Sequence, residues 1–300
     1  MVAALGGNAL LRRGEPVTAG VQRANAARAA GALAGLVRAG HALVVTHGNG
    51  PQVGLLALQG AAFRPEAPDP LDVLGAETEG MIGYLIEQEL ENALGHDRPV
   101  AALLTQVVVD PADPAFARPT KPVGPVYPED EARHLAQARG WAIAPDGPHW
   151  RRVVPSPAPL EIPDLGVIRL LLAQGVVVIC AGGGGIPVVR RADGSLTGVE
   201  AVIDKDHASA LLARGIGADA LLMLTDVDGV QDGFGTPGAR RIARLTADQA
   251  MRLALPAGSM GPKVAAGQGF VAAGGRLAGI GRMEDAAAIL TGAAGTVIAD

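Results

Sequence analysis

The chain has 300 residues, of which 49% are hydrophobic and 3% aromatic, and its formal net charge is −5. This length fits one large domain or two ordinary ones with a substantial core. The acidic balance argues against a general nucleic-acid-binding protein, which would show a basic face. No apolar run approaches the roughly 18–20 residues of a membrane span, and the first residues lack the basic segment of a signal peptide. We therefore expect a cytoplasmic protein without nucleic-acid or membrane partners.

Short β-rich runs alternate with longer amphipathic runs along the chain. We expect strands at 2–5, 42–46, 100–109, 176–180, 220–225, 277–280 and 296–299. We expect helices at 18–39, 71–94, 165–174, 205–214, 246–255, 262–273 and 284–291. Strand and helix in alternation predict an α/β fold, with a mostly parallel sheet that helices cover on both faces.

Residues 110–160 interrupt this alternation. The segment is dense in proline and holds four of the eight aromatic residues, namely Phe116, Tyr127, Trp141 and Trp150. A disordered linker would be poor in aromatic residues. We expect a small inserted subdomain with a modest core of its own, which stands off the main sheet.

Three expected strands run directly into glycine-rich turns: VAALGGNAL at 2–10, VVTHGNGPQVG at 44–54 and VVICAGGGGIPV at 177–188. Glycine lets the backbone turn sharply and lets its N–H groups approach an anion closely. In open parallel sheets a ligand lies beyond the carboxyl ends of the strands, where all three turns fall. Packing explains one such turn equally well, but three at equivalent places predict a ligand site.

The common nucleotide-binding motifs are absent or weak. The chain has no G-x-x-x-x-G-K-[ST] sequence, so it is not a P-loop enzyme. The turn at Gly48 and Gly50 reads G-x-G-x-x-x-G, and a proline-rich stretch follows it instead of a strand that ends in an acidic residue. A dinucleotide-binding fingerprint is therefore poor.

Lysine is rare in this chain, which has 22 arginines and three lysines, Lys121, Lys205 and Lys263. A lysine ammonium is a compact charge that can follow a moving phosphoryl group, whereas the planar guanidinium of arginine grips a pair of oxygens. All three lysines lie among glycine, proline and aspartate, unlike random surface lysines. We expect them to be functional; the alternative is chance survival under arginine-biased coding.

Two of the lysines are expected in the first turn of a helix. Lys205 follows Asp204, a suitable N-cap, and Lys263 follows Pro262, a residue favoured at the first helical position. A cation there is disfavoured by roughly 0.3–1 kcal/mol, unless an anion lies beside it. We expect both lysines and several helix N-termini to converge on phosphate groups, with Asp206 holding the lysines apart.

Taken together, these motifs resemble those of the carbamate kinases in the amino-acid kinase family. The resemblance runs in order from residue 3 to about residue 265 through ALGGNAL, HGNGPQVG, DPAF, PTKPVGPVY, CAGGGGIPV, AVIDKDHASALLA, LTDVDGV and GSMGPKV. It implies one domain over residues 1–300, an open, mainly parallel three-layer αβα sandwich with residues 110–160 as a protruding subdomain. It further implies a carbamate and phosphoryl site in about residues 1–200 and a nucleotide site in about residues 201–300.

The resemblance also implies an activity. Carbamate kinases transfer a phosphoryl group reversibly between ATP and carbamate, which gives ADP and carbamoyl phosphate, and commonly run toward ATP in arginine catabolism. Positioning and charge stabilisation do nearly all the work of such a transfer, without a covalent nucleophile. We accordingly expect a homodimer that uses Mg²⁺ between the nucleotide phosphates, with no metal ligand assigned to the chain.

Site residues are carried over position by position. The catalytic residues are expected to be Lys205, Lys263, Asp206 and, from the subdomain, Lys121. The carbamate and phosphoryl site is expected to include Gly6, Gly7, Asn8, Gly48, Asn49, Gly50, Gly183 and Gly184. The nucleotide is expected to contact Thr225, Asp226, Val227, Asp228, Gly229, Val230, Ser259, Met260 and Gly261.

One stretch departs from the family, and two other readings stay open. After LTDVDGV the chain reads QDGFGTPGARRI, where many members carry tyrosines beside the adenine, so the nucleotide preference is undecided. His47 and His207 lie inside motifs, although structural histidines are commoner than chemical ones, and Cys180 ends an apolar run as an inert buried thiol would. Uridylate and acylglutamate kinases would lack the PTKPVGP segment. A nucleotide-binding regulator without turnover would not need the lysines.

Overall fold

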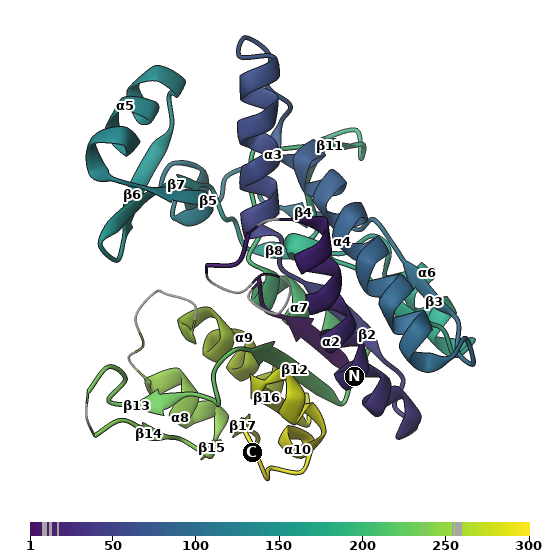
Figure 1. The fold of residues 1–300 in the computed structure, drawn as a ribbon. Coiled ribbons are helices and arrows are strands. Elements are labelled where there is room, and N and C mark those ends of the chain that lie inside the picture. The colour runs from purple at the N-terminus through teal and green to yellow at the C-terminus, as the bar shows by residue number, and fades with distance from the viewer. Residues whose placement is uncertain (8–10, 12–13, 17, 237, 254, 256–259) are drawn as a thin grey trace.

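The computed structural model describes residues 1–7, 11, 14–16, 18–236, 238–253, 255 and 260–300. Its largest feature is an eight-stranded sheet (Figure 1). The spatial order is β15 (Arg244–Leu245), β17 (Thr296–Ile298), β16 (Leu277–Arg282), β12 (Ala220–Thr225), β1 (Val2–Leu5), β2 (Val44–His47), β9 (Val177–Ile179) and β3 (Val100–Ala102). Neighbouring strands are parallel except for β16 and β17. The mainly parallel α/β fold expected from the sequence is confirmed.

Helices cover both faces of this sheet, which is why its central strands read as unbroken apolar runs. In β1, Ala3 and Leu5 belong to one core cluster, and Val2 and Ala4 belong to another on the opposite face. The first face packs against α2 (Ala19–Arg38), α4 (Leu71–Leu94) and α10 (Ala286–Leu290). The second packs against α6 (Leu165–Ala173), α7 (Lys205–Gly215), α8 (Ala247–Arg252) and α9 (Met260–Ala272). The result is a three-layer sandwich.

A smaller four-stranded sheet contains β11 (Leu196–Gly198), β10 (Ile186–Arg190), β4 (Gln106–Val109) and β8 (Pro159–Glu161). The single strand expected at 100–109 was therefore wrong, because the chain leaves the main sheet after β3 and enters the second sheet as β4. Thr105 makes this turn. Its N–H donates to a carboxylate oxygen of Glu79 at 3.1 Å, and its carbonyl accepts from the N–H of Ile186 at 2.8 Å.

One helix, α3 (Gly50–Phe63), was not expected from the sequence. Its segment GPQVGLLALQGAAF contains three glycines and a proline, which are the weakest helix formers. Pro51 lies in the first turn, where proline is tolerated because that N–H has no partner in the helix. A smaller difference concerns α9, which includes Met260, so that Pro262 is its third residue instead of its first.

Residues 121–154 form a separate unit, here called the arm, beside the upper end of α3 in Figure 1. It consists of β5 (Lys121–Tyr127), α5 (Glu129–Arg139), β6 (Ala142–Asp146) and β7 (His149–Val154), with antiparallel strands in the order β5-β7-β6. Its tryptophan rings stack with guanidinium groups. Arg133 lies 5.1 Å from the Trp150 ring, and Arg139 and Arg152 lie 5.0 and 4.8 Å from the Trp141 ring.

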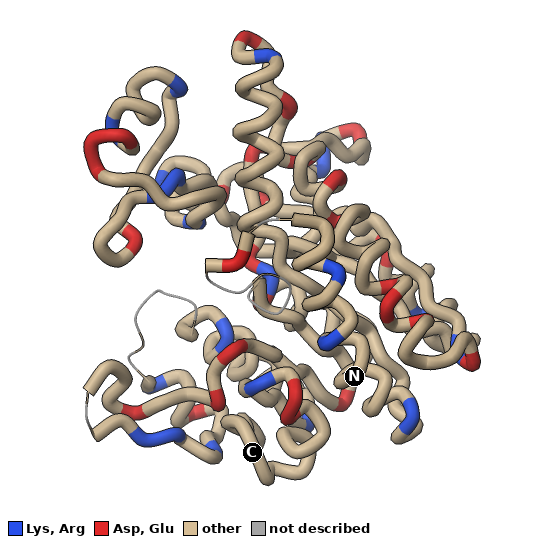
Figure 2. The backbone as a smooth tube through the Cα atoms, viewed as in Figure 1, with Lys and Arg blue, Asp and Glu red and all other residues tan. Residues whose placement is uncertain are grey.

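A short hairpin of β13 (Gln231–Asp232) and β14 (Arg240–Arg241) follows β12. Basic and acidic residues are interspersed along the backbone (Figure 2). Within the described parts of the chain, none of the helices has the length and apolar character that crossing a bilayer requires.

Candidate active site

The three glycine-rich turns meet at one edge of the main sheet, because β1, β2 and β9 are neighbours and end on the same side. A Cβ atom on Gly48 would lie 3.2 Å from the backbone nitrogen of Gly7. One on Gly183 would lie 2.1 Å from the side-chain nitrogen of Asn49. The N–H of Gly6 donates to the carbonyl of Leu224 in β12 at 2.7 Å. The turns are therefore in direct contact, with no room for larger side chains at Gly183.

The turn at 182–185 also touches the start of α7. Gly183 and Gly184 have φ angles of +67° and +98°, which favour glycine. A Cβ on Gly184 would lie 2.4 Å from the carbonyl oxygen of Ile203, two residues before Lys205. Ala181 holds a left-handed conformation with φ +50°, a strained backbone of the kind that collects at functional sites. The glycine turn thus fixes the position of the helix that carries Lys205.

Lys205 and Lys263 converge on one carboxylate. Lys205 Nζ donates to one oxygen of Asp206 at 2.5 Å, and Lys263 Nζ donates to the other at 2.9 Å. All three side chains are buried. Lys205 is the first residue of α7 and Lys263 the fourth of α9, so both lie in the first turn of a helix. Asp206 sets the spacing of the two ammonium groups by binding one with each oxygen.

The charges of this cluster depend on one another. Burial alone would raise the pKa of Asp206, but the ammonium groups of Lys205 and Lys263 outweigh it and hold that pKa well below its usual range. Burial lowers the pKa of Lys205, and the attraction of Asp206 opposes this shift. The cluster carries two positive charges against one negative charge. A buried excess of positive charge at two helix N-termini favours binding of an anion.

The third lysine approaches from the arm. Lys121 Nζ lies 2.5 Å from a carboxylate oxygen of Asp204, the N-cap of α7. The structure therefore brings Lys121 beside the helix of Lys205 and Asp206, paired with a residue that sequence analysis treated only as a cap.

Sequence analysis missed a carboxylate that supports the glycine turn. Glu79 in α4 is 3% exposed, and its two oxygens accept from the N–H groups of Gly182 at 2.7 Å and Thr105 at 3.1 Å. Burial raises the pKa of Glu79 to about 8 against the effect of these two donors. The preceding residue, Thr78, accepts a hydrogen bond from the Asn49 amide at 2.9 Å. The signal that could have found it is a glutamate on the otherwise apolar stripe of a helix, beside Ile82 and Ile86.

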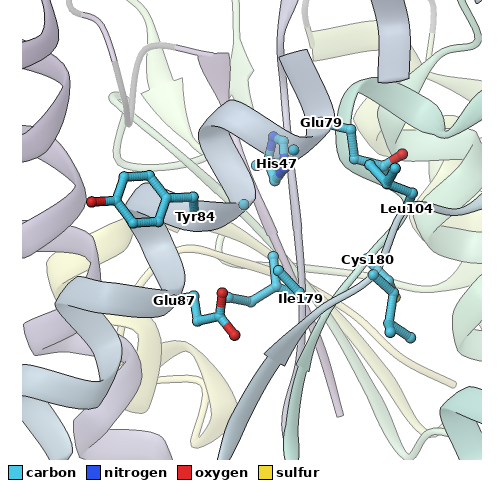
Figure 3. Close-up of a pocket in the computed structure, with 11 residues that line it drawn as sticks. His47, Glu79, Tyr84, Glu87, Leu104, Ile179 and Cys180 are labelled. Atoms are coloured by element: carbon cyan, nitrogen blue, oxygen red, sulfur yellow. The ribbon is translucent and has the colours of Figure 1, made fainter. Parts of the chain in front are cut away.

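Behind this turn lies a pocket of about 150 Å³ lined by His47, Glu79 and Cys180 among others (Figure 3). Burial lowers the pKa of His47 to about 4, so the ring is neutral near pH 7. Its Nδ1 lies 3.2 Å from the Gly48 carbonyl, and its Nε2 has no hydrogen-bond partner among the described residues. Cys180 is buried, and burial raises its pKa above the ordinary value.

The expected nucleotide residues lie next to the glycine turns. The segment from Thr225 to Val230 begins at the last residue of β12, and a Cβ on Gly6 would lie 3.6 Å from the Cα of Thr225. The Val230 N–H donates to the Thr296 hydroxyl at 2.8 Å, which fixes the end of the segment. Met260 and Gly261 begin α9, one turn before Lys263, and Gly50 begins α3. The expected contacts Asn8 and Ser259 lie outside the described residues.

This arrangement has the parts that phosphoryl transfer needs. Phosphoryl transfer is stabilised mainly by fixed positive charges and hydrogen-bond donors around the moving group, and two ammonium groups are held here beside three glycine-rich turns. Among the described residues, no group of three or more His, Cys, Asp or Glu side chains is arranged so that it could hold a metal ion.

Comparisons with known proteins agree with this chemistry. The model of the amino acid kinase family matches residues 1–282. A carbamate kinase from Rhizobium meliloti (strain 1021) is 56% identical over 300 residues, covering 99% of this chain and 92% of that protein. One from Escherichia coli (strain K12) is 51% identical, covering 99% of this chain and 98% of that protein.

Solved structures show the same relationship. Carbamate kinase from Giardia lamblia bound to citric acid has a TM-score of 0.93 and 41% sequence identity, over 99% of this chain and 97% of that chain. The same enzyme bound to AMP-PNP has a TM-score of 0.90 and 40% identity, with the same coverage. This chain therefore belongs to the amino acid kinase family and, within it, to the carbamate kinases.

Proposed function

We propose that the chain transfers a phosphoryl group between carbamoyl phosphate and ADP, giving carbamate and ATP, at the cluster of Lys205, Asp206 and Lys263. The observation that carries this proposal is the pairing of both buried ammonium groups with one carboxylate, beside three glycine turns in contact. A relative named carbamate kinase is 56% identical over 99% of this chain. Uridylate or acylglutamate phosphorylation is the less favoured alternative.

In the proposed step, a terminal oxygen of the β-phosphate of ADP attacks the phosphorus of carbamoyl phosphate. The new P–O bond to ADP forms as the bond between phosphorus and the carbamoyl oxygen breaks, and carbamate leaves with that electron pair. Lys205 and Lys263 accompany the phosphoryl oxygens during this movement, and Asp206 keeps their spacing fixed. The glycine turns that contain Gly50 and Gly183 hold the carbamoyl phosphate through backbone N–H groups. The reverse reaction uses the same contacts.

We infer that Mg²⁺ enters with the nucleotide, since this cation is usually held by phosphate oxygens and one or two carboxylates. Asp226 and Asp228, which follow β12, offer carboxylate oxygens of the type that Mg²⁺ prefers. The cation would neutralise charge on the transferring group. A relative bound to AMP-PNP supports a nucleotide site in this chain. The stretch after Val230 leaves the choice of base open.

The direction and location are also part of the proposal. We infer that the reaction runs mainly toward ATP in arginine catabolism, as the sequence resemblance suggests. The cytoplasm is the proposed location, because ADP and ATP are available there and a lone cysteine stays a thiol in that compartment.

A homodimer is proposed along the β3 edge of the main sheet. Three large apolar side chains are exposed near this edge: Met81 at 38%, Tyr84 at 51% and Leu104 at 57%. An open sheet edge with exposed apolar neighbours favours association with another chain. In sedimentation experiments the wild-type protein should therefore have twice the mass of one chain, and Leu104→Asp should lower the measured mass. A wild-type protein that is monomeric at micromolar concentration would contradict the proposal.

The function is tested by supplying the purified protein with ADP, Mg²⁺ and carbamoyl phosphate and measuring ATP with a coupled enzyme. The expected result is ATP formation well above the enzyme-free background. UMP and N-acetylglutamate, each with ATP, serve as competing acceptors in parallel assays. A folded protein that makes no ATP would contradict the proposal, and faster phosphorylation of either competitor would move the chain elsewhere in the family.

A further inference from the structure

Asp204 makes two kinds of contact with its two carboxylate oxygens. Oδ1 caps α7 by accepting from the backbone N–H groups of Asp206 at 2.9 Å and His207 at 3.4 Å. Oδ2 accepts from Lys121 Nζ at 2.5 Å. One side chain thus joins the first turn of the helix that carries Lys205 to a residue 83 positions earlier, in the arm.

Besides the apolar packing of Val123 and Val154 against Val53 of α3, two contacts close together hold the arm to the body. Lys121 begins β5, and Gly124, three residues later, crosses Gly54 in α3 so closely that a Cβ on Gly54 would lie 1.9 Å from its Cα. The backbone crossing fixes β5 at Gly124, but it sets neither the start of the strand nor the direction of the flexible lysine side chain. The ion pair sets that direction. Both partners are largely shielded, with side-chain exposures of 28% for Lys121 and 17% for Asp204.

Charge balance supports the same reading. Asp206 already pairs with two ammonium groups, so a third ammonium brought near them without its own counterion would be repelled. Asp204 provides that counterion two residues away. Three lysines and two aspartates leave one net positive charge, which suits the uptake of an anion.

We propose that Asp204 is the positioning residue for Lys121, holding the arm lysine over the phosphoryl site before substrate arrives. This rests on the proposed function, since carbamoyl phosphate is the anion that Lys121 would meet. Asp204 itself acts through Lys121 and through the helix cap, without touching the reacting atoms.

Asp204→Asn separates the two contacts, because asparagine is as good an N-cap as aspartate but carries no charge. We expect KM for carbamoyl phosphate to rise about tenfold, as for loss of a charge-assisted hydrogen bond, with KM for ADP within about twofold. Glu129→Gln is the matched control, since it removes an exposed arm ion pair of 2.6 Å with Arg133, far from the cap. Asp204→Ser, which also keeps a capping oxygen, replaces the Asn variant should that one fail to fold.

The decisive comparison repeats Asp204→Asn in a Lys121→Ala background. If Asp204 acts through Lys121, the second substitution should change KM for carbamoyl phosphate by less than about twofold there. An equal increase in both backgrounds would show that Asp204 acts through the cap or the other lysines, and would overturn the proposal. No increase in either background would overturn it as well.

A second measurement does not depend on turnover. Hydrogen–deuterium exchange of residues 121–127 should be faster in Asp204→Asn than in wild type, and unchanged in Glu129→Gln. If the wild-type protein makes no ATP but the variant still exchanges faster, the proposed function fails while the role of the ion pair in holding the arm stands. Equal exchange in wild type and Asp204→Asn would show that the pair does not hold the arm, whatever the activity.

Discussion

Asp206 pairs with two ammonium groups and has almost no exposure to water. Loss of its negative charge should therefore destabilise the folded protein strongly. Asp206→Asn would leave Lys205 and Lys263 as buried cations without a counterion. We expect the free energy of unfolding to fall by about 3–5 kcal/mol, measured by urea denaturation. Inorganic phosphate should stabilise the variant more than the wild type, because the anion replaces the lost charge. A loss below about 1 kcal/mol would show that solvent already screens the cluster.

Glu79 should make the folded protein less stable as the pH rises, which is the opposite of the usual effect of a carboxylate. Its pKa is raised to about 8 in the folded protein, against an ordinary value of 4.5. The folded state then binds more protons than the unfolded state between these two values, so stability is lost as the pH rises through this window. The slope should approach about 1.4 kcal/mol per pH unit. The pKa of His47 is lowered from 6.5 to about 4. Between these two values His47 makes the folded protein more stable as the pH rises.

Glu79→Gln isolates this effect, because glutamine fills the same space and does not titrate, while His47 stays in both proteins. We expect the stability of wild type relative to the variant to decline steadily from pH 5 to pH 8 in urea unfolding experiments. A difference that stays constant across this range would show that Glu79 is ionised throughout, held by the N–H groups of Gly182 and Thr105.

Cys180 should resist thiol reagents. It is 1% exposed next to the end of β9, and burial raises its pKa, so neither access nor thiolate is available in the folded state. We expect a chromogenic disulfide reagent to leave native enzyme unmodified and fully active, and to titrate the thiol once urea is added. Rapid modification of the native protein would contradict the burial of this strand end.

At the scale of elements, the crossing of α3 and β5 is a point where only glycine fits. A Cβ on Gly54 would meet the backbone of Gly124 at 1.9 Å, and backbone cannot swing away as a side chain can. We expect Gly54→Ala to cost about 1–3 kcal/mol and to raise KM for carbamoyl phosphate by displacing the arm.

The matched control for Gly54→Ala is Gly31→Ala in α2, where no atom lies within 4 Å of the added Cβ. That change should stabilise the protein by about 0.5–1 kcal/mol through helix propensity alone. Thermal unfolding of both variants compares them directly. Equal stabilisation by Gly54→Ala and Gly31→Ala would show that the backbone of Gly124 does not pack tightly against Gly54.

Local signals predicted the elements that carry the two central lysines. The N-cap aspartate and the neighbouring proline indicated helix starts at Lys205 and at Pro262, because capping depends on nearby residues only, and the second helix in fact begins two residues earlier, at Met260. Helix α3 escaped prediction because local propensity disfavours glycine, whereas Gly54 is required there by its long-range contact with Gly124. The break after β3 also depends on a distant partner, the carboxylate of Glu79.

The same limit applies to the site. The sequence shows which lysines are unusual. It does not show which carboxylate each lysine pairs with. Asp206 was expected to hold Lys205 and Lys263 apart, and in the structure it binds both. The link from Lys121 to Asp204 spans 83 residues, and no periodic pattern encodes such a contact.

At the scale of the whole molecule, the sheet order explains why distant motifs form one site. The strands β12, β1, β2 and β9 are neighbours, so residues near 6, 48, 183 and 225 meet at one edge. Helices α7 and α9 lie together on one face and bring Lys205 and Lys263 to the same carboxylate. The arm then adds Lys121 from outside the sheet.

The central claim is that these two lysines accompany the transferring phosphoryl group, and kcat of Lys205→Arg and Lys263→Arg for ATP synthesis tests it most directly. Arginine keeps the charge but cannot reproduce the compact geometry at Asp206. With far-UV circular dichroism unchanged, each variant should lose roughly 100-fold in kcat, about 2.7 kcal/mol of transition-state stabilisation. A folded variant of either kind that keeps half of the wild-type kcat would contradict the account.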